Sequence, residues 1–207
     1  MRNRRHLSGL AAMVLAGLLF SVASAEPSSG PAAQVQQTVD AVLGILRHRD
    51  LAPEVRRQEI VRLVQGRFDF HTMARGALAA NWKRATAQEQ ERFTELFGRL
   101  LESTYLGRIE AYTDERVEYR GERVEGDRAE VRTVIVSNVE IPVEYRLRQE
   151  GGRWLVYDVV VEGVSLVRNY RSTYGEIVKR EGIGGLLAQM EAKSRELRPD
   201  GAGSATR

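Results

Sequence analysis

The amino-acid sequence predicts an α+β fold in which helices wrap around one curved, four-stranded antiparallel sheet. Two patterns support this. Between residues 35 and 112, apolar side chains recur every three or four positions, which is typical of amphipathic helices. Between residues 117 and 161, apolar and polar side chains alternate, which is typical of strands with one solvated face. A helical period returns at Ser165 and continues to Met190.

The first 25 residues have the composition of a cleaved secretory signal. An arginine-rich start precedes the apolar run from Leu7 to Val22, and Ala23-Ser24-Ala25 has the small residues of a cleavage site. A membrane anchor is the alternative, but the apolar run is shorter than the roughly 20 residues that a spanning helix needs. We therefore expect the mature chain to begin at Glu26. Residues 26–33 then read as a flexible leader, residues 34–197 as a single domain, and residues 198–207 as a disordered tail.

Charge and cysteine content exclude several classes of protein. Three of the 31 Lys and Arg residues lie in the signal, which leaves 28 to balance 28 Asp and Glu. A neutral mature protein lacks the basic surface of a nucleic-acid-binding protein. The chain contains no cysteine, so it has neither disulfides nor an N-terminal cysteine for lipidation.

Helices are predicted in order along the first half of the chain. The first starts at Val35, and the second starts at Pro53, because proline suits the first position of a helix, and ends at Gly66. A short third helix lies within residues 68–82, where Asp69 is a candidate cap. Thr86 and Glu89 form a capping box before a long helix that continues to Tyr112.

Four strands follow, separated by short polar turns at Gly126-Asp127, Ser137-Asn138 and Gly151-Gly152. Pro142 cannot donate a ladder hydrogen bond, so its strand is predicted to lie at an edge or to carry a bulge. The last strand, from Trp154 to Val161, leads through Glu162-Gly163 directly into a helix. Ser165 is predicted to cap this helix, and Gly182 to break it before a final short amphipathic helix.

No catalytic or metal-binding constellation emerges from the mature chain. It holds two histidines, His48 and His71, and no cysteine, so a His/Cys metal site is not expected. The segment from Gly163 to Val167 lacks the second glycine of a nucleophile elbow, and no histidine follows it. Asp158 interrupts an apolar strand, and we interpret it as a hydrogen-bonded or rim aspartate. We therefore expect no enzymatic activity, although a small hydrolase or isomerase that uses Asp158 or His71 is the alternative.

Two blocks of the sequence carry a family resemblance. The C-terminal block is YDVVVEGVSLVRNYRSTYGEIVKREGIGGLLAQMEAK (Tyr157 to Lys193), and the upstream block is FDFHTMARGALAANWKRATAQEQERFTELFGRLLESTYLGRIEAY (Phe68 to Tyr112). Both resemble the MlaC family of periplasmic phospholipid-shuttle proteins, also known as toluene-tolerance proteins. Together they cover nearly the whole mature chain in the right order. One departure is Ala79-Ala80, where many members carry a glycine before the tryptophan.

The resemblance implies a soluble monomer in the periplasm that maintains outer-membrane lipid asymmetry. Its cargo would be a diacyl phospholipid, with a hopanoid as the alternative, and it would need no cofactor. Its partners would be an inner-membrane ABC transporter with an MCE-domain subunit and an outer-membrane lipoprotein–porin complex. The resemblance also implies a fold akin to the cystatin-like roll.

Acyl chains need a dry aliphatic pocket, because each buried methylene contributes about 0.8 kcal/mol. The periodic apolar faces of the sheet, the long helix and the strand-to-helix junction supply candidates for its lining. They are Phe93, Phe97, Leu100, Leu101, Val139, Ile141, Val143, Tyr145, Val159, Val161, Val164, Leu166 and Val167. Ordinary core packing would give the same periodicity and remains the alternative.

Basic side chains after the junction are candidates for the lipid headgroup, because guanidinium groups suit bidentate contacts with phosphate. They are Arg168, Arg171, Lys179 and Arg180. A solvated helix face would carry the same charges, so both interpretations stay open at this point.

Overall fold

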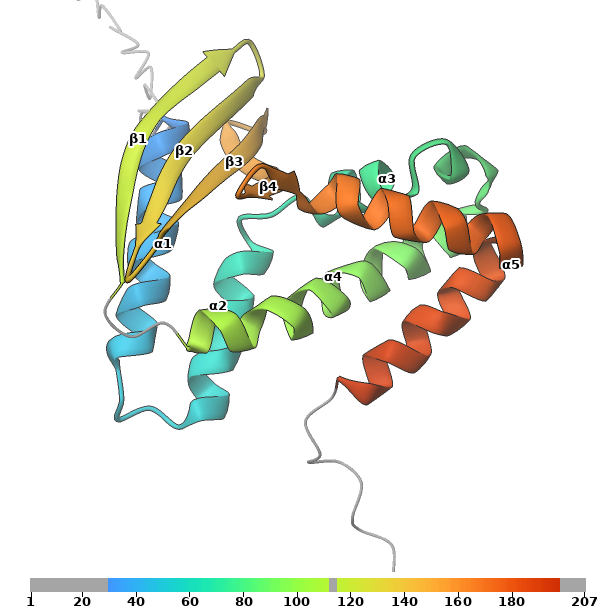
Figure 1. Ribbon diagram of the computed structural model, residues 1–207, viewed down its shortest axis with the longest axis horizontal. Coiled ribbons are helices and arrows are strands. Elements are labelled where there is room, and N and C mark those ends of the chain that lie inside the picture. Colours follow the sequence, from blue (N-terminus) through green and yellow to red (C-terminus); the bar gives the residue numbers. More distant parts are fainter. Residues whose placement is uncertain (1–29, 112–114, 198–207) are drawn as a thin grey trace, which may run out of the picture.

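The computed structural model describes residues 30–111 and 115–197. The predicted signal, residues 26–29 of the predicted leader and the predicted tail lie outside the described residues. Figure 1 shows an α+β molecule in which the sheet and α1 occupy one side, while α3, α4 and α5 occupy the other. The α+β prediction is therefore confirmed.

The helices begin and end close to the predicted positions. They are α1 (Pro31–Arg47), α2 (Pro53–Gln65), α3 (Phe70–Leu78), the 3-10 helix η1 (Ala79–Arg84), α4 (Ala87–Glu110) and α5 (Leu166–Glu196). Pro31 occupies the start of α1, so residues 31–33, predicted to end the leader, instead form the first turn of this helix. The proline supplies a favourable φ angle at a position whose N–H has no helical partner.

Side-chain caps fix three helix starts, as the sequence predicts. The Asp69 carboxylate accepts a hydrogen bond from Thr72 N at 2.9 Å at the start of α3. Thr86 and Glu89 form the reciprocal capping box of α4, with Glu89 N donating to Thr86 Oγ1 at 3.2 Å and Thr86 N donating to Glu89 Oε2 at 2.8 Å. The Ser165 hydroxyl accepts from Arg168 N at 3.1 Å and caps α5.

The sheet is antiparallel and has five strands rather than the predicted four. Its strands, in spatial and chain order, are β1 (Arg116–Glu125), β2 (Arg128–Val136), β3 (Glu140–Glu150), β4 (Arg153–Val161) and β5 (Val164–Ser165). The additional strand β5 has only two residues, which is too short to produce an alternating pattern. It pairs with the end of β4 after a turn in which Glu162 and Gly163 have φ angles of 50° and 82°.

Pro142 does not mark an edge strand. Strand β3 lies between β2 and β4, and Pro142 sits one residue beyond Val143, whose pairing with Val161 is the last of the β3–β4 register. The Pro142 carbonyl still accepts a hydrogen bond from Glu162 N at 3.0 Å. Because Pro142 lies past the end of that ladder, its missing N–H costs no hydrogen bond to β4.

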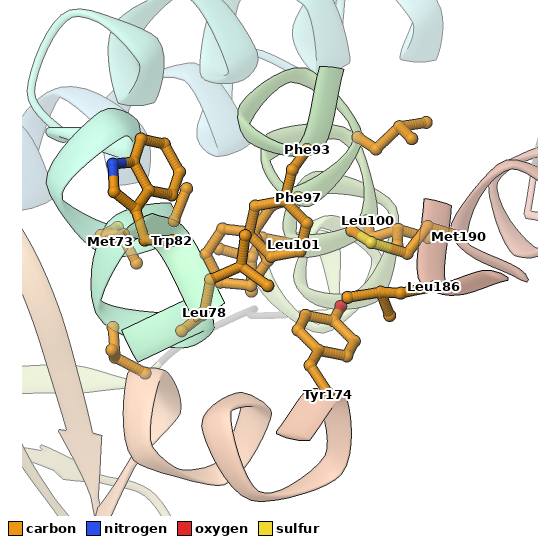
Figure 2. Close-up of a cluster of buried hydrophobic side chains, with 14 of the residues drawn as sticks. Met73, Leu78, Trp82, Phe93, Phe97, Leu100, Leu101, Tyr174, Leu186 and Met190 are labelled. Atoms are coloured by element: carbon orange, nitrogen blue, oxygen red, sulfur yellow. The ribbon is translucent and has the colours of Figure 1, made fainter. Parts of the chain in front are cut away.

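Two separate clusters of buried side chains form the core. One lies between α1 and one face of the sheet, here called the inner face, which carries Val131, Val143, Leu147, Val156 and Val159 among others. The other lies among α3, α4 and α5 and is here called the helical core (Figure 2). Phe68 packs against both clusters. The strand-to-helix junction also joins them, because Leu166 packs against the first cluster and Val167 belongs to the second.

Candidate functional site

A small apolar cavity lies where α1 crosses the inner face of the sheet. Its volume is about 30 Å³, room for one or two water molecules. The lining comes from α1, from the segment before α3, and from β3 and β4. These residues are Gln34, Val35, Thr38, Val39, Arg67, Phe68, Tyr145, Leu147 and Val156. We call this region, between α1 and the inner face, the α1 seam.

Polar contacts attach the N-terminal half of α1 to β1 and to β4. The buried Gln34 amide pairs with the Trp154 backbone in both directions, and Trp154 N donates to Gln34 Oε1 at 3.1 Å. Ala32 N donates to Glu122 Oε2 of β1 at 2.9 Å. A helix held at these points covers the inner face with its own apolar stripe, which includes Val35 and Val39.

The residues predicted to line one pocket divide between the two clusters. Those on the sheet side pack in or against the cluster of the inner face: Ile141, Val143, Tyr145, Val159, Val161 and Leu166. Those on the helices belong instead to the helical core: Phe93, Phe97, Leu100, Leu101 and Val167. Val139 and Val164 are 63% and 57% exposed, so the predicted inward orientation of these two side chains is wrong. Val139 lies in the turn between β2 and β3, and Val164 begins the two-residue strand β5 directly after a turn, so alternation assigns a face to neither.

Aromatic side chains pack closely in the helical core (Figure 2). Phe93 and Phe97 are fully buried, with stacked rings 5.8 Å apart. The Tyr174 ring meets the edge of Phe93 at 5.6 Å. Leu186 and Met190, which follow the break at Gly182, close the same cluster. Stacked and T-shaped contacts between aromatic rings therefore hold these helices together.

Asp158 is a structural residue at the junction of sheet and helix. It is 4% exposed and accepts hydrogen bonds from Ser165 Oγ at 2.6 Å and Val167 N at 3.1 Å. Arg146 Nη1 donates to Asp158 Oδ2, the oxygen that also accepts from Ser165, at 3.2 Å. The interpretation of Asp158 as a hydrogen-bonded aspartate is confirmed. These partners do not include His71, whose ring packs edge-on against Trp82 at 5.3 Å.

Asp69 makes a second link between helix and sheet. Besides capping α3, its carboxylate receives a hydrogen bond from the Arg148 side chain of β3. Burial raises the pKa of Asp69, but hydrogen bonds from Thr72 and the charge of Arg148 outweigh burial and leave this pKa below its usual value. Asp69 is therefore charged at neutral pH, and it ties α3 to the sheet beside the α1 seam.

Tyr119 carries a polar group that the fold leaves unsatisfied. Its hydroxyl is buried and has no hydrogen-bond partner among the described residues. Its ring packs against the cluster of the inner face. Burial, which is the main cause, raises the pKa of Tyr119 above its usual value. The phenol is therefore neutral at the protein's working pH, and its oxygen lies beside apolar side chains.

The basic residues predicted for a headgroup lie along the exposed surface of α5. Arg168, Arg171, Lys179 and Arg180 are all exposed, and the lining of the α1 seam includes none of them. The Arg171 side chain donates to the Gly76 carbonyl at 2.9 Å and braces α5 against α3. Arg67, which the sequence analysis did not single out, is the basic residue in the lining of the seam. Its position follows Gly66 in a turn, and no periodic pattern assigns a direction to such a residue.

Two further properties bear on function. Within residues 30–111 and 115–197, no group of three or more His, Cys, Asp or Glu side chains is placed to hold a metal ion. None of the helices in those ranges combines the length and apolar character needed to cross a membrane.

Comparison with known proteins gives consistent matches. Residues 36–192 match the family model described as MlaC protein. The chain is 25% identical over 126 residues to the intermembrane phospholipid transport system binding protein MlaC of Haemophilus influenzae; this match spans 58% of the chain and only 59% of the relative. It is 25% identical over 182 residues to the toluene tolerance protein ttg2D of Pseudomonas putida, which covers 84% of the chain and 83% of the relative.

The fold is also similar to a crystal structure of a phospholipid-binding protein from Ralstonia solanacearum, determined in complex with a phospholipid. The TM-score is 0.71 at 27% sequence identity, and the match covers 80% of this chain and 97% of the other. The two proteins therefore share their architecture over almost the full length of the Ralstonia protein.

Proposed function

The chain belongs to the MlaC family, and from this premise we propose that it is a periplasmic phospholipid-binding carrier without enzymatic activity. It shuttles a diacyl phospholipid between the outer and inner membranes and so maintains the lipid asymmetry of the outer membrane. The observation that carries this proposal is the similarity to the phospholipid-bound Ralstonia protein, which extends over 97% of that protein. Lipid is the cargo, and carriage needs no cofactor.

The acyl chains lie in the α1 seam. Six of its nine lining residues are aliphatic or aromatic, and each methylene that enters gains about 0.8 kcal/mol relative to water. The present volume of about 30 Å³ is far smaller than a fatty acyl chain, so α1 must separate from the inner face to admit one. The acyl chains then replace the contacts that Val35 and Val39 make with the sheet.

The helical core is a less suitable place for the chains. Opening it would break the stacking of Phe93 on Phe97 and the edge contact of Tyr174, each of which adds to the burial of large aromatic surfaces. It would also break the ion pair of Arg92 with Glu191, which holds the second half of α5 to α4 at 2.7 Å. We therefore assign a structural role in the helical core, rather than a place in the pocket wall, to five of the predicted lining residues: Phe93, Phe97, Leu100, Leu101 and Val167.

The same proposal covers location, partners and fold. The predicted signal at residues 1–25 supports export, and the protein acts as a monomer in the periplasm. It exchanges lipid with an inner-membrane ABC transporter that has an MCE-domain subunit, and with an outer-membrane lipoprotein–porin complex. The inner face with α1 packed across it supports a cystatin-like roll as the lipid-holding part of the fold.

Native mass spectrometry tests the proposal. Delipidated protein is mixed with vesicles that contain phosphatidylethanolamine, phosphatidylglycerol and a hopanoid, and is then separated and weighed. We expect one added mass equal to a diacyl phospholipid. An added hopanoid mass would instead support the alternative cargo. Protein that carries no bound lipid after mixing with these vesicles would contradict the proposed carrier function.

A matched pair of variants tests the location of the chains. Val39→Glu places a charge on the half-buried side of α1 that lines the seam, and it should lower lipid occupancy about tenfold or more, because a carboxylate is costly to bury without a partner. Val55→Glu makes the same change at a side chain of α2 that is 42% exposed and should leave occupancy unchanged. Equal occupancy in both variants would place the lipid elsewhere.

A further inference from the structure

Arg67 occupies an unusual position at the border of the α1 seam. It follows Gly66, the C-cap of α2, and precedes Phe68, whose ring packs against both core clusters. Its carbonyl accepts a hydrogen bond from Val156 N at 2.9 Å, and Asp69 N donates to Val156 O at 2.8 Å. The backbone at Arg67 is therefore fixed to the edge of β4, and Arg67 is one of the residues that line the cavity.

The guanidinium group of Arg67 has no hydrogen-bond or ion-pair partner among residues 30–111 and 115–197. Several other partly buried arginines of the fold are paired with carboxylates. Arg57 binds Glu110 through two hydrogen bonds of 3.1 and 2.7 Å, and Arg146 contacts Asp158 at 3.2 Å. Arg67 is half-buried and borders apolar side chains, and its guanidinium has no anion to bind among the described residues.

We propose that Arg67 binds the phosphate group of the lipid cargo at the entrance to the α1 seam. This inference rests on the proposed function and adds the residue that recognises the headgroup. A guanidinium presents parallel N–H groups that match two phosphate oxygens, and these charge-assisted hydrogen bonds are among the strongest available to a side chain. From a phosphate held there, the acyl chains run between Val39 of α1 and Leu147 and Val156 of the inner face.

The site selects for chemical class as well as for position. A phosphodiester supplies the anion that Arg67 lacks, whereas a diacylglycerol with the same acyl chains supplies only neutral esters. Free phosphate offers the same anion without the chains, so the two sources of phosphate are separable by experiment. The exposed arginines of α5 contribute no such discrimination, because they lie outside the seam.

The test compares Arg67→Gln, Arg67→Lys and a control, Arg62→Gln, in the full-length mature protein. Arg62 lies on α2, five residues earlier, with a side chain that is 72% exposed and paired with Glu59 at 2.7 Å. Binding of fluorescent phosphatidylglycerol and of diacylglycerol with the same chains is measured from phosphatidylcholine vesicles, and binding of inorganic phosphate is measured by calorimetry. Thermal unfolding of each variant checks that the fold is intact.

We expect Arg67→Gln to weaken phosphatidylglycerol binding about 10- to 100-fold, since a hydrogen-bonded ion pair is lost, and to leave diacylglycerol binding unchanged. Arg67→Lys should restore part of the loss, and Arg62→Gln should have no effect. An equal loss for both lipids, or no loss for phosphatidylglycerol, would overturn the assignment. Binding of inorganic phosphate as tight as that of the lipid would overturn it in favour of a free-phosphate site. Wild-type protein that binds neither lipid would contradict the proposed function itself.

Discussion

The hydroxyl of Ser165 donates a hydrogen bond of 2.6 Å to Asp158 Oδ2 and, at the same time, accepts one of 3.1 Å from Arg168 N. One side chain thus caps α5 and ties its first turn to β4. Asp158 completes the link by accepting from Val167 N at 3.1 Å. The adjacent residues Leu166 and Val167 enter different core clusters, so this link fixes how the sheet and the helical core are joined.

The first prediction concerns this junction. Asp158→Ala should lower the free energy of unfolding by about 3 kcal/mol, because it leaves a buried N–H of Val167 and the Arg146 guanidinium without their acceptor. Ser165→Ala should cost about 1–2 kcal/mol through loss of the cap. Ser172→Ala, an exposed serine on the same helix, should change stability by less than about 0.5 kcal/mol. Urea unfolding measures all three; equal stabilities would show that the junction does not hold the two clusters together.

The second prediction concerns pH. The pKa of Asp69 is lower in the folded protein than in the unfolded chain, so its contribution to stability is fully present above the ordinary carboxyl pKa and is lost as pH falls through the folded value. Asp69→Asn should therefore be about 1–3 kcal/mol less stable than wild type at pH 7. This difference should shrink below about pH 4. A difference that stays constant down to pH 2 would mean that the charge of Asp69 is not responsible.

The third prediction concerns the break in α5. Gly182 has φ 72° and ψ −179°, a conformation that is essentially restricted to glycine, so Gly182→Ala should destabilise the protein by about 1–3 kcal/mol. Gly184 lies two residues later in the second half of the helix, with open space around its Cα, so Gly184→Ala should be neutral or stabilising by up to about 1 kcal/mol. Thermal unfolding of the two variants compares them directly. If Gly182→Ala is as stable as Gly184→Ala, the fold does not require the break.

The fourth prediction concerns Tyr119, whose buried hydroxyl has no partner among the described residues. Tyr119→Phe removes a desolvated polar group and keeps the ring, so it should raise the free energy of unfolding of lipid-free protein by about 1 kcal/mol. Tyr145→Phe is a suitable comparison, because the Tyr145 hydroxyl forms a hydrogen bond with Thr133. Removal of this hydroxyl should lower the free energy of unfolding. A loss of stability in Tyr119→Phe would indicate that its hydroxyl has a partner in solution.

Local signals in the sequence predicted most of the elements, because their causes are local. The capping box of Thr86 and Glu89, the cap at Ser165 and the break at Gly182 each depend on residues a few positions apart. The turns of the sheet are likewise local. Strand β5 was missed because two residues carry no period. For the strand of Pro142 the prediction gave two alternatives, an edge position or a bulge. The edge position is wrong because β3 is an internal strand, whereas a bulge does occur in the β3–β4 pair, opposite the step from Arg146 to Leu147.

The candidate site was harder to predict, since periodicity shows which side chains face inward but not which interior they enter. Phe93 and Val143 have equally clear inward patterns, yet they lie in different clusters. Tyr157 is an extra residue opposite the step from Arg146 to Leu147, so the inward positions of β4 change from Trp154 and Val156 to Val159 and Val161. Arg67 reaches the seam through tertiary hydrogen bonds to Val156, which no local pattern encodes.

Photo-crosslinking shows whether phospholipid chains occupy the α1 seam. Protein is loaded with a phospholipid that carries a diazirine on one acyl chain, irradiated, digested and mapped by mass spectrometry. We expect adducts on α1 around Val35 and Val39 and on the inner face around Leu147 and Val156. Adducts concentrated on Phe93, Phe97 and their neighbours in the helical core would contradict it.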